Sequence, residues 1–321
     1  MNPLFEQLPT SIFARMSALA AEHGAVNLGQ GFPDFGWPED VLEKAAEATL
    51  KGSNQYAPMM GVPALREAVA EHYRRHQGLA VEAGGVIVTS GATEALASSI
   101  MALVEPGDEV VLFQPLYDAY APLVRRAGGV PRFVRLTPPD WGITEEALAE
   151  AFTPRTRLVV FNNPQNPTAR LYGAEELRLL AEFCVRHDAV MLSDEVWEHL
   201  VFDGRRFVSL ASLPGMAERT VKVGSAGKIF SLTGWKVGWI VAPPALALPI
   251  SKAHQFLTFA TAPNLQAAVA YGLGKEQGYF DGMRAAFQKA RDEMASALEA
   301  IGYITLPVEG TYFLSVDLAA S

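Results

Sequence analysis

The stretch GVIVTSGATEALASSIMALVEPGDEVVLF, residues 85–113, decides the fold. It opens with a short β-rich run at 85–90, continues with an apolar pattern at helical spacing at 93–104, and ends with a second β-rich run at 109–113. Continuous apolar strands separated by helices are typical of a mostly parallel sheet that is covered on both faces. The stretch therefore predicts an α/β fold.

The same alternation continues along the chain, and it predicts a seven-stranded sheet. Helical patterns separate most of the β-rich runs, at 118–128, 144–152 and 174–188. Open sheets of this kind bind ligands beyond the carboxyl ends of their strands, so we expect the functional residues there. The seven predicted strands are 85–90, 109–113, 130–136, 157–162, 189–196, 220–225 and 237–242.

The two ends of the chain follow a different pattern. We expect residues 46–285 to form a large domain, and residues 1–45 and 286–321 to form an N-terminal arm and a partial small domain. These flanks hold an irregular segment rich in glycine and proline, NLGQGFPDFGWPED, and two short strands within residues 303–318. The helices expected outside the alternating region are 11–23, 244–259 and 278–301.

Composition narrows the class of protein. The 321 residues carry 26 Lys and Arg against 35 Asp and Glu, a formal net charge of −9, and no run of basic residues is longer than two, which makes nucleic acid an improbable partner. The one cysteine, Cys184, lies in a helical pattern and is expected to be a buried apolar residue, which fits a cytoplasmic protein. A signal peptide is not expected, because the N-terminal MNPLFEQLPTS has no cationic start followed by an apolar core. A membrane span is not expected, because prolines interrupt the most apolar stretch, VGWIVAPPALALPI.

Lys228 lies in an unusually apolar stretch, SAGKIFSLTGWKVGW, residues 225–239. Burial lowers the pKa of a lysine because it disfavours the charged form, and a neutral amine can attack a carbonyl carbon. The alternative is a surface lysine whose stem lies on apolar neighbours while its amine stays in water. The residues around the other strand ends decide between these interpretations.

Three other stretches place polar groups after predicted strands. TSGATEA would direct the amides of Gly91, Ala92 and Thr93 outward from a helix start, which suits a phosphate, although a well-capped helix would look the same. Asn166 in NNPQNPTA would present a side-chain amide donor at the carboxyl edge of the sheet, although its presence could also be explained by a turn alone. Asp194 in SDEVWEH ends a buried strand, where we expect a cationic partner unless it caps a helix.

Together these groups describe a pocket for pyridoxal phosphate (PLP). Ser225 and Lys236 flank Lys228 and could add a hydroxyl and a cation to the phosphate donors. The set then holds donors for a phosphate, an acid for a ring nitrogen, an amide for a phenolic oxygen and an amine for an aldehyde.

The ordered motifs resemble the class I/II PLP-dependent aminotransferases of fold type I, and within them the kynurenine, glutamine and methionine transaminase group. The matching motifs cover nearly the whole chain: NLGQGFPDF, NQYAPMMGVPALREA, NNPQNPTA, SDEVWEHLVFDG, SAGKIFSLTGWKVGW and HQFLTFATAP. The resemblance implies that Lys228 bonds to the cofactor aldehyde and serves as the catalytic acid and base. It also implies an L-amino acid donor, aromatic or sulfur-containing, and a 2-oxo acid acceptor.

The resemblance also implies roles for the other residues. Asp194 would pair with the ring nitrogen, Asn166 would hold the phenolic oxygen, and Tyr117 would stack on the ring. A homodimer would bring Tyr56 to the phosphate and Phe259 to the substrate pocket of the neighbouring subunit. The phosphate donors would be Gly91, Ala92, Thr93, Ser225 and Lys236, and the pocket would be lined by Phe13 and Gly31.

Three positions depart from the family pattern. Trp197 stands where a tyrosine is more usual, and its indole N–H has a different reach toward the phenolic oxygen. Ala169 replaces a glycine. The family arginine that holds the substrate carboxylate would lie in a C-terminal segment that we expect this chain to lack, since its last arginine is Arg291 and it ends at Ser321. One alternative is therefore a PLP-binding but weakly active or inactive, C-terminally truncated chain.

The same sequence features can be compared with other activities and with a metal site. A cysteine-conjugate β-lyase would use the same pocket without an oxo-acid acceptor. A dinucleotide-binding enzyme is improbable, because GQGFPDFG lacks the third glycine of that fingerprint. His72 and His76 have the spacing of metal ligands, but the arginines between them favour a solvated helix face, so no metal is expected.

Overall fold

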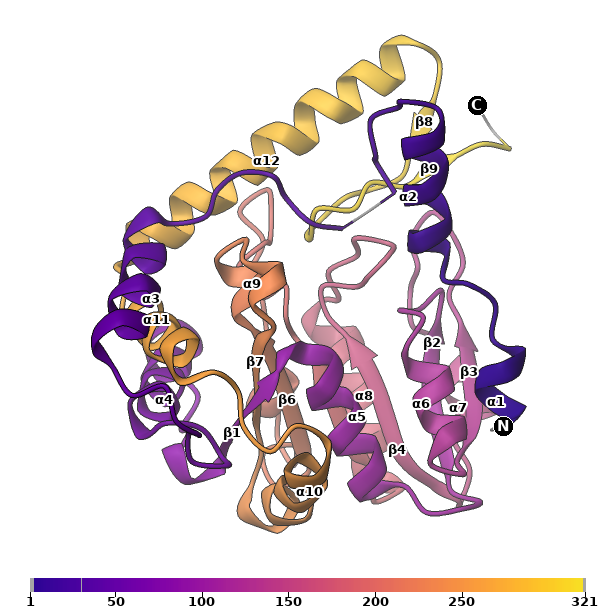
Figure 1. The fold of residues 1–321 in the computed structure, drawn as a ribbon. Coiled ribbons are helices and arrows are strands. Elements are labelled where there is room, and N and C mark those ends of the chain that lie inside the picture. The colour runs from indigo at the N-terminus through magenta and orange to yellow at the C-terminus, as the bar shows by residue number, and fades with distance from the viewer. Residues whose placement is uncertain (1–2, 30, 320–321) are drawn as a thin grey trace.

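The computed structural model describes residues 3–29 and 31–319, and its centre is a seven-stranded sheet in the order β1-β7-β6-β5-β4-β2-β3 (Figure 1). All strands run parallel except β7, which pairs antiparallel with both β1 and β6. The α/β prediction and all seven predicted strands are confirmed. The strands are β1 (Val86–Ser90), β2 (Glu109–Gln114), β3 (Val130–Arg135), β4 (Thr156–Asn162), β5 (Val190–Asp194), β6 (Thr220–Ser225) and β7 (Val237–Val241).

Helices cover both faces of the sheet because successive strand residues point to opposite sides. In β2, Leu112 belongs to the buried cluster that includes Leu96 of α5, whereas Phe113 belongs to the cluster that includes Leu180 of α8. Full burial of each such side chain stabilises the fold by about 1.5–3 kcal/mol. The helices of this region are α5 (Gly91–Leu103), α6 (Tyr120–Arg126), α7 (Glu145–Ala151), α8 (Ala174–Arg186), α9 (Ala226–Ile229) and α10 (Pro244–Leu257).

A third buried cluster joins three helices to the β1 and β7 end of the sheet. They are α3 (Glu39–Lys51), α4 (Pro63–Gln77) and α11 (Pro263–Leu273), and they contribute Val41, Val69 and Val269 to the cluster. In Figure 1, α3, α4 and α11 lie together at one side of the sheet.

Helix α12 (Gln277–Ala300), helix α2 (Ile12–Glu22) and a short strand pair lie above the carboxyl ends of the parallel strands (Figure 1). The long helix α12 crosses this side, and the short antiparallel strands β8 (Ile304–Thr305) and β9 (Val316–Asp317) follow it. Helices α1 (Pro3–Gln7) and α2 precede α3. The flanking helices and strand pair expected from the sequence are therefore present.

Burial confirms one expectation and corrects another. Cys184 is buried, and burial raises the pKa of its thiol to about 12. The prediction of a solvated helix face at His72 and His76 is wrong for His72, whose exposed fraction is 0%. The ring of Phe280 from α12 packs 5.4 Å from that of His72, so a distant element covers this side of α4. None of the described helices is both long and apolar enough to cross a membrane.

Candidate active site

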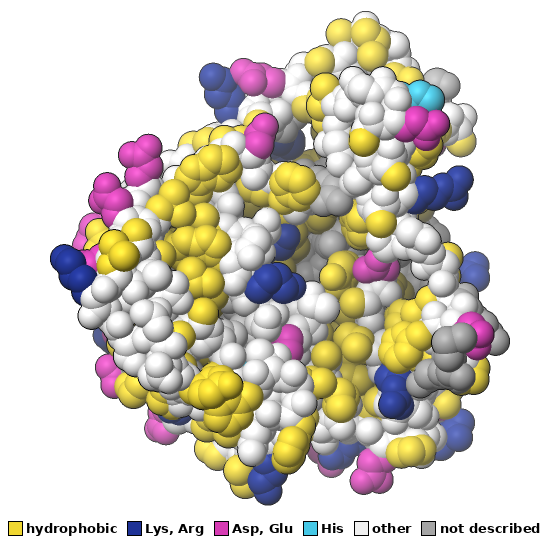
Figure 2. Space-filling model, in the orientation of Figure 1, with side chains coloured by type: hydrophobic (Ala, Val, Ile, Leu, Met, Phe, Trp, Pro, Cys, Tyr) yellow, Lys and Arg dark blue, Asp and Glu magenta, His cyan; other side chains and the backbone are white. Residues whose placement is uncertain are grey.

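A cavity of about 390 Å³ lies at the carboxyl ends of the parallel strands. Figure 2 shows the hollow in the middle of this face, with Lys and Arg side chains inside it. Its lining joins residues that follow β1, β2, β4, β5 and β6, as expected for an open α/β sheet. The predicted residues in this lining are Gly31, Gly91, Ala92, Thr93, Tyr117, Asn166, Asp194, Trp197, Ser225, Lys228 and Lys236.

Lys228 lies in α9, directly after β6, and its amine faces the cavity. Its Nζ donates a hydrogen bond to the hydroxyl of Tyr312 at 2.8 Å and lies 4.6 Å from the ring centre of Trp197. Burial lowers the pKa of this lysine to about 8, with a further lowering from the charge of Lys236. A large fraction of the amine is therefore neutral near pH 8, as a nucleophile or a base requires.

Asp194 is the last residue of β5, and it is buried at the floor of the site. Its carboxylate accepts hydrogen bonds from the Tyr120 hydroxyl at 2.7 Å and from the Val196 amide at 3.4 Å. None of the described residues, 3–29 and 31–319, forms an ion pair with the Asp194 carboxylate. Burial raises the pKa of this carboxyl to about 6. A buried carboxylate in this state fits a cation such as a protonated ring nitrogen.

Backbone amides and a lysine meet at the β1 end of the cavity. The antiparallel register pairs Ser90 with Val237, which brings Lys236, just before β7, beside Gly91 at the start of α5. Gly91 has a φ of +71°, and a Cβ there would lie 3.2 Å from Nζ of Lys236. The start of α5, the Lys236 cation and Ser225 thus form a cradle that suits a phosphate dianion.

Two asparagines follow β4. The Asn162 amide donates to the Asp194 carbonyl at 2.8 Å, and its Oδ1 accepts from the Asn166 backbone N–H at 2.6 Å. These bonds position the loop that holds Asn166 against the cavity. The donor set, the amine and the buried acid together fit PLP.

Several lining residues were not predicted from the sequence: Phe32, Tyr120, Asn162 and Thr233. Asn162 ends a predicted strand, so its position was a usable signal. Tyr120 and Tyr312 gave no such signal, because they reach Asp194 and Lys228 only through the tertiary fold.

Three predicted residues, Tyr56, Phe259 and Phe13, are not part of the lining. Tyr56 is 87% exposed, and its ring packs edge-on against that of Phe259 at 5.5 Å between centres. Phe13 lies in α2 and is half-buried. The structure of one chain does not bring these residues to Lys228.

The chain is similar to known aminotransferases over nearly its whole length. The chain is 44% identical to the probable N-succinyldiaminopimelate aminotransferase DapC of Mycobacterium tuberculosis over 96% of this chain and 78% of that protein. It is 42% identical to the methionine aminotransferase of Escherichia coli over 99% of this chain and 84% of that protein. Human kynurenine–oxoglutarate transaminase 1 is 39% identical, over 94% of this chain and 76% of that protein.

Solved structures agree in fold. The N-succinyldiaminopimelate aminotransferase of Mycobacterium tuberculosis superimposes with a TM-score of 0.97 at 42% identity, covering all of this chain and 84% of that one. YbdL from Escherichia coli, described as a methionine aminotransferase, gives 0.96 at 42% identity with the same coverage. The model of the family "Aminotransferase class I and II" matches residues 23–321. The chain therefore belongs to the class I and II aminotransferases, enzymes that transfer an amino group to a 2-oxo acid.

Proposed function

We propose that this aminotransferase holds PLP in the cavity and takes its amino group from an L-amino acid with an aromatic or sulfur-containing side chain. The observation that carries the proposal is the presence of Lys228 and Asp194 in one cavity. Burial shifts the pKa of the amine down and the pKa of the carboxyl up, to about 8 and about 6. Opposed shifts of this kind are typical of acid and base groups at an active site.

Each residue would have a distinct task. The start of α5, Ser225 and Lys236 would bind the phosphate, and Asp194 would hold a proton at the ring nitrogen. PLP, when bound, supplies an electron-withdrawing ring that accepts the electron pair of the substrate α-carbon. The free amine of Lys228 would take the proton from the substrate α-carbon and deliver it to C4′ of the cofactor.

Aromatic side chains support the proposed donor class. Phe32, Tyr117 and Trp197 line the cavity and suit an apolar or aromatic substrate side chain. The names of the relatives include methionine and kynurenine.

The test is a steady-state assay with a panel of amino donors. We expect methionine, phenylalanine or kynurenine to exceed aspartate by about 10-fold or more in kcat/KM, with turnover that requires an added 2-oxo acid. Release of ammonia and pyruvate from a cysteine conjugate without an acceptor would instead favour the β-lyase alternative.

A homodimer with shared sites is also proposed. Support comes from exposed aromatic residues, since Tyr56 and Phe256 are both 87% exposed and Phe259 packs beside Tyr56. Large exposed apolar groups are typical of association surfaces. A second copy would bring Tyr56 and Phe259 to a site that the single chain does not complete. Cytoplasmic location stays a prediction.

A further inference from the structure

Three histidines and a buried glutamate meet on the far side of Asp194, outside the cavity described above. His72 and His76 lie one turn apart on α4, and Glu198 and His199 lie in the segment after β5. Nε2 of His72 is 2.8 Å from Nε2 of His199, and one ligand atom from each of His72, Glu198 and His199 lies within 4.8 Å of the others. The His76 ring centre is 4.4 Å from that of His72 and 5.4 Å from that of His199.

Burial lowers the pKa of all three histidines, that of His199 to about 3, which favours the neutral imidazole. Neutral imidazole is the form that binds metal ions. The two Nε2 atoms of His72 and His199 share a single proton at 2.8 Å, and a metal ion bound between them would replace that proton.

One ring nitrogen of His76 is available to a metal ion. The Nδ1–H of this ring donates to the side-chain oxygen of Gln277 at 3.0 Å, so Nε2 carries the lone pair. In the described part of the chain, this buried Nε2 has no hydrogen-bond partner. A second hydrogen bond that fixes the ring and leaves the other nitrogen free is the usual arrangement around metal-binding histidines.

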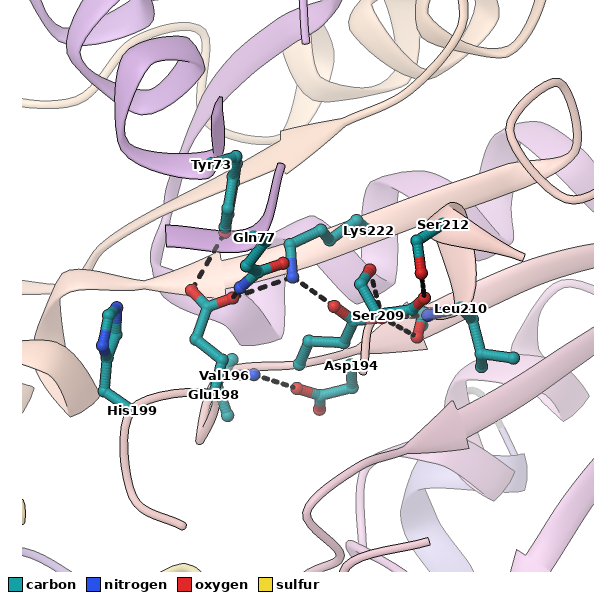
Figure 3. Close-up of polar contacts among 12 residues, drawn as sticks. Tyr73, Gln77, Asp194, Val196, Glu198, His199, Ser209, Leu210, Ser212 and Lys222 are labelled. Atoms are coloured by element: carbon teal, nitrogen blue, oxygen red, sulfur yellow. Dashed lines mark hydrogen bonds and ion pairs between the residues drawn. The ribbon is translucent and has the colours of Figure 1, made fainter. Parts of the chain in front are cut away.

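A buried group of two carboxylates and one ammonium lies beside the histidines. The Glu198 carboxylate accepts hydrogen bonds from Tyr73 at 3.2 Å, from Lys222 at 2.8 Å and from the side-chain amide of Gln77 at 2.5 Å. Lys222 also pairs with Glu195. Figure 3 shows Tyr73, Gln77 and Lys222 around this carboxylate, with His199 beside it. Two carboxylates against one ammonium leave one negative charge.

The other cations that act on these histidines are Arg75 and Arg284, and Arg284 is paired with Asp281 at 2.8 Å. Arg205 and Arg206 line the adjacent cavity, and Arg205 is paired with Glu309 at 3.0 Å.

We propose that His72, His76, Glu198 and His199 bind a divalent zinc ion that fastens α4 to the segment after β5. Imidazoles with one carboxylate suit Zn²⁺, which takes four ligands in structural sites. A separate cavity of about 270 Å³ adjoins the site, and its lining includes His76, Glu198 and His199 together with Arg205, Arg206 and Arg284. Closing the site needs the two Nε2 atoms to separate by a few tenths of an ångström, since Zn–N distances near 2.0–2.1 Å place tetrahedral ligands more than 3 Å apart.

The test uses the full-length chain after dialysis against a chelator. Titration calorimetry with Zn²⁺ alone should show saturable binding of one ion per chain, and thermal unfolding should shift to a higher temperature as Zn²⁺ is added. Co²⁺ should give the visible absorption of a four-coordinate site. Absence of saturable binding to the unmodified chain would overturn the proposal.

Matched variants locate the ion. His76→Gln, on a half-buried residue, and His199→Gln should each weaken Zn²⁺ binding by about 10-fold or more while far-UV circular dichroism stays unchanged. His23→Gln, at an exposed histidine, is the control and should bind as the unmodified chain does. Equal affinity in all three variants would show that the ion binds elsewhere and would contradict the assignment.

Discussion

Lys228 is the residue on which the chemistry depends, and its surroundings explain its reactivity. Burial lowers the pKa of the amine, whereas the negative charge of Asp194 raises it, and the result is about 8. Tyr312 accepts the amine's hydrogen bond at 2.8 Å and so directs it. The sequence predicted a buried reactive lysine from its apolar neighbours, but it could not reveal Tyr312, which lies 84 residues further along the chain.

The lowered pKa of Lys228 predicts how the cofactor-free protein reacts with PLP. The nucleophile is the neutral amine, so the rate of PLP incorporation should rise with pH around a midpoint near 8. An ordinary lysine would have its midpoint near 10.4. Stopped-flow absorbance measures this rate. In Asp194→Asn the midpoint should move lower, because the negative charge that raises the pKa of Lys228 is lost. A midpoint above 10 in the unmodified protein would contradict the burial of Lys228.

Asp194 predicts a conflict between stability and function. Its folded-state pKa of about 6 lies above the usual 3.8, so the cofactor-free fold loses stability as pH rises from about 4 through about 6. The loss is of the order of 2–3 kcal/mol. Asp194→Asn should remove it, and the variant should be more stable than the unmodified chain at pH 7.5 yet bind PLP more weakly. Urea unfolding at pH 4.5 and 7.5 checks the first statement, and a variant that is less stable at both pH values argues against it.

At the scale of elements, β7 organises the phosphate cradle. The alternation of apolar runs predicted this strand, but it could not predict the antiparallel direction, since periodicity is the same for both directions. That direction brings Lys236 beside Gly91.

The burial of His72 likewise could not be predicted, because the local sequence HYRRH is polar and the covering residues come from distant elements.

Gly91 permits the close approach of α5 and Lys236. Gly91→Ala places a Cβ at a φ of +71°, which costs roughly 1–2 kcal/mol, and it crowds the Lys236 amine at 3.2 Å. We expect PLP affinity to fall by about 10- to 100-fold, as the loss of one charged hydrogen bond would cause. Gly78→Ala is the matched control, because Gly78 has a φ of +68° with nothing within 4 Å of an added Cβ. It should lose similar stability but keep its PLP affinity, and equal loss of affinity in both would refute the cradle.

At the scale of the whole molecule, the motifs and their order predicted the family correctly. The large domain at 46–285 and the flanking units at 1–45 and 286–321 stay predictions. So does the dimer, since a single chain carries no information on its copies beyond exposed residues such as Tyr56.

Complementation tests the shared site. Lys228→Ala and Tyr56→Ala should each be strongly impaired, and unfolding and refolding them together should recover about a quarter of normal activity, because half of the random dimers contain one intact site. Refolding each variant alone is the control. No gain on mixing, with dimers present by ultracentrifugation, would rule out sites shared through Tyr56.

The most direct test of the central claim is borohydride reduction of the PLP-treated protein followed by peptide mass spectrometry. The account predicts one stable cofactor adduct per chain, on the peptide that contains Lys228, and no adduct at this position in Lys228→Ala. An adduct that forms mainly on another lysine, or an equal visible absorption band in Lys228→Ala without added amine, would contradict it.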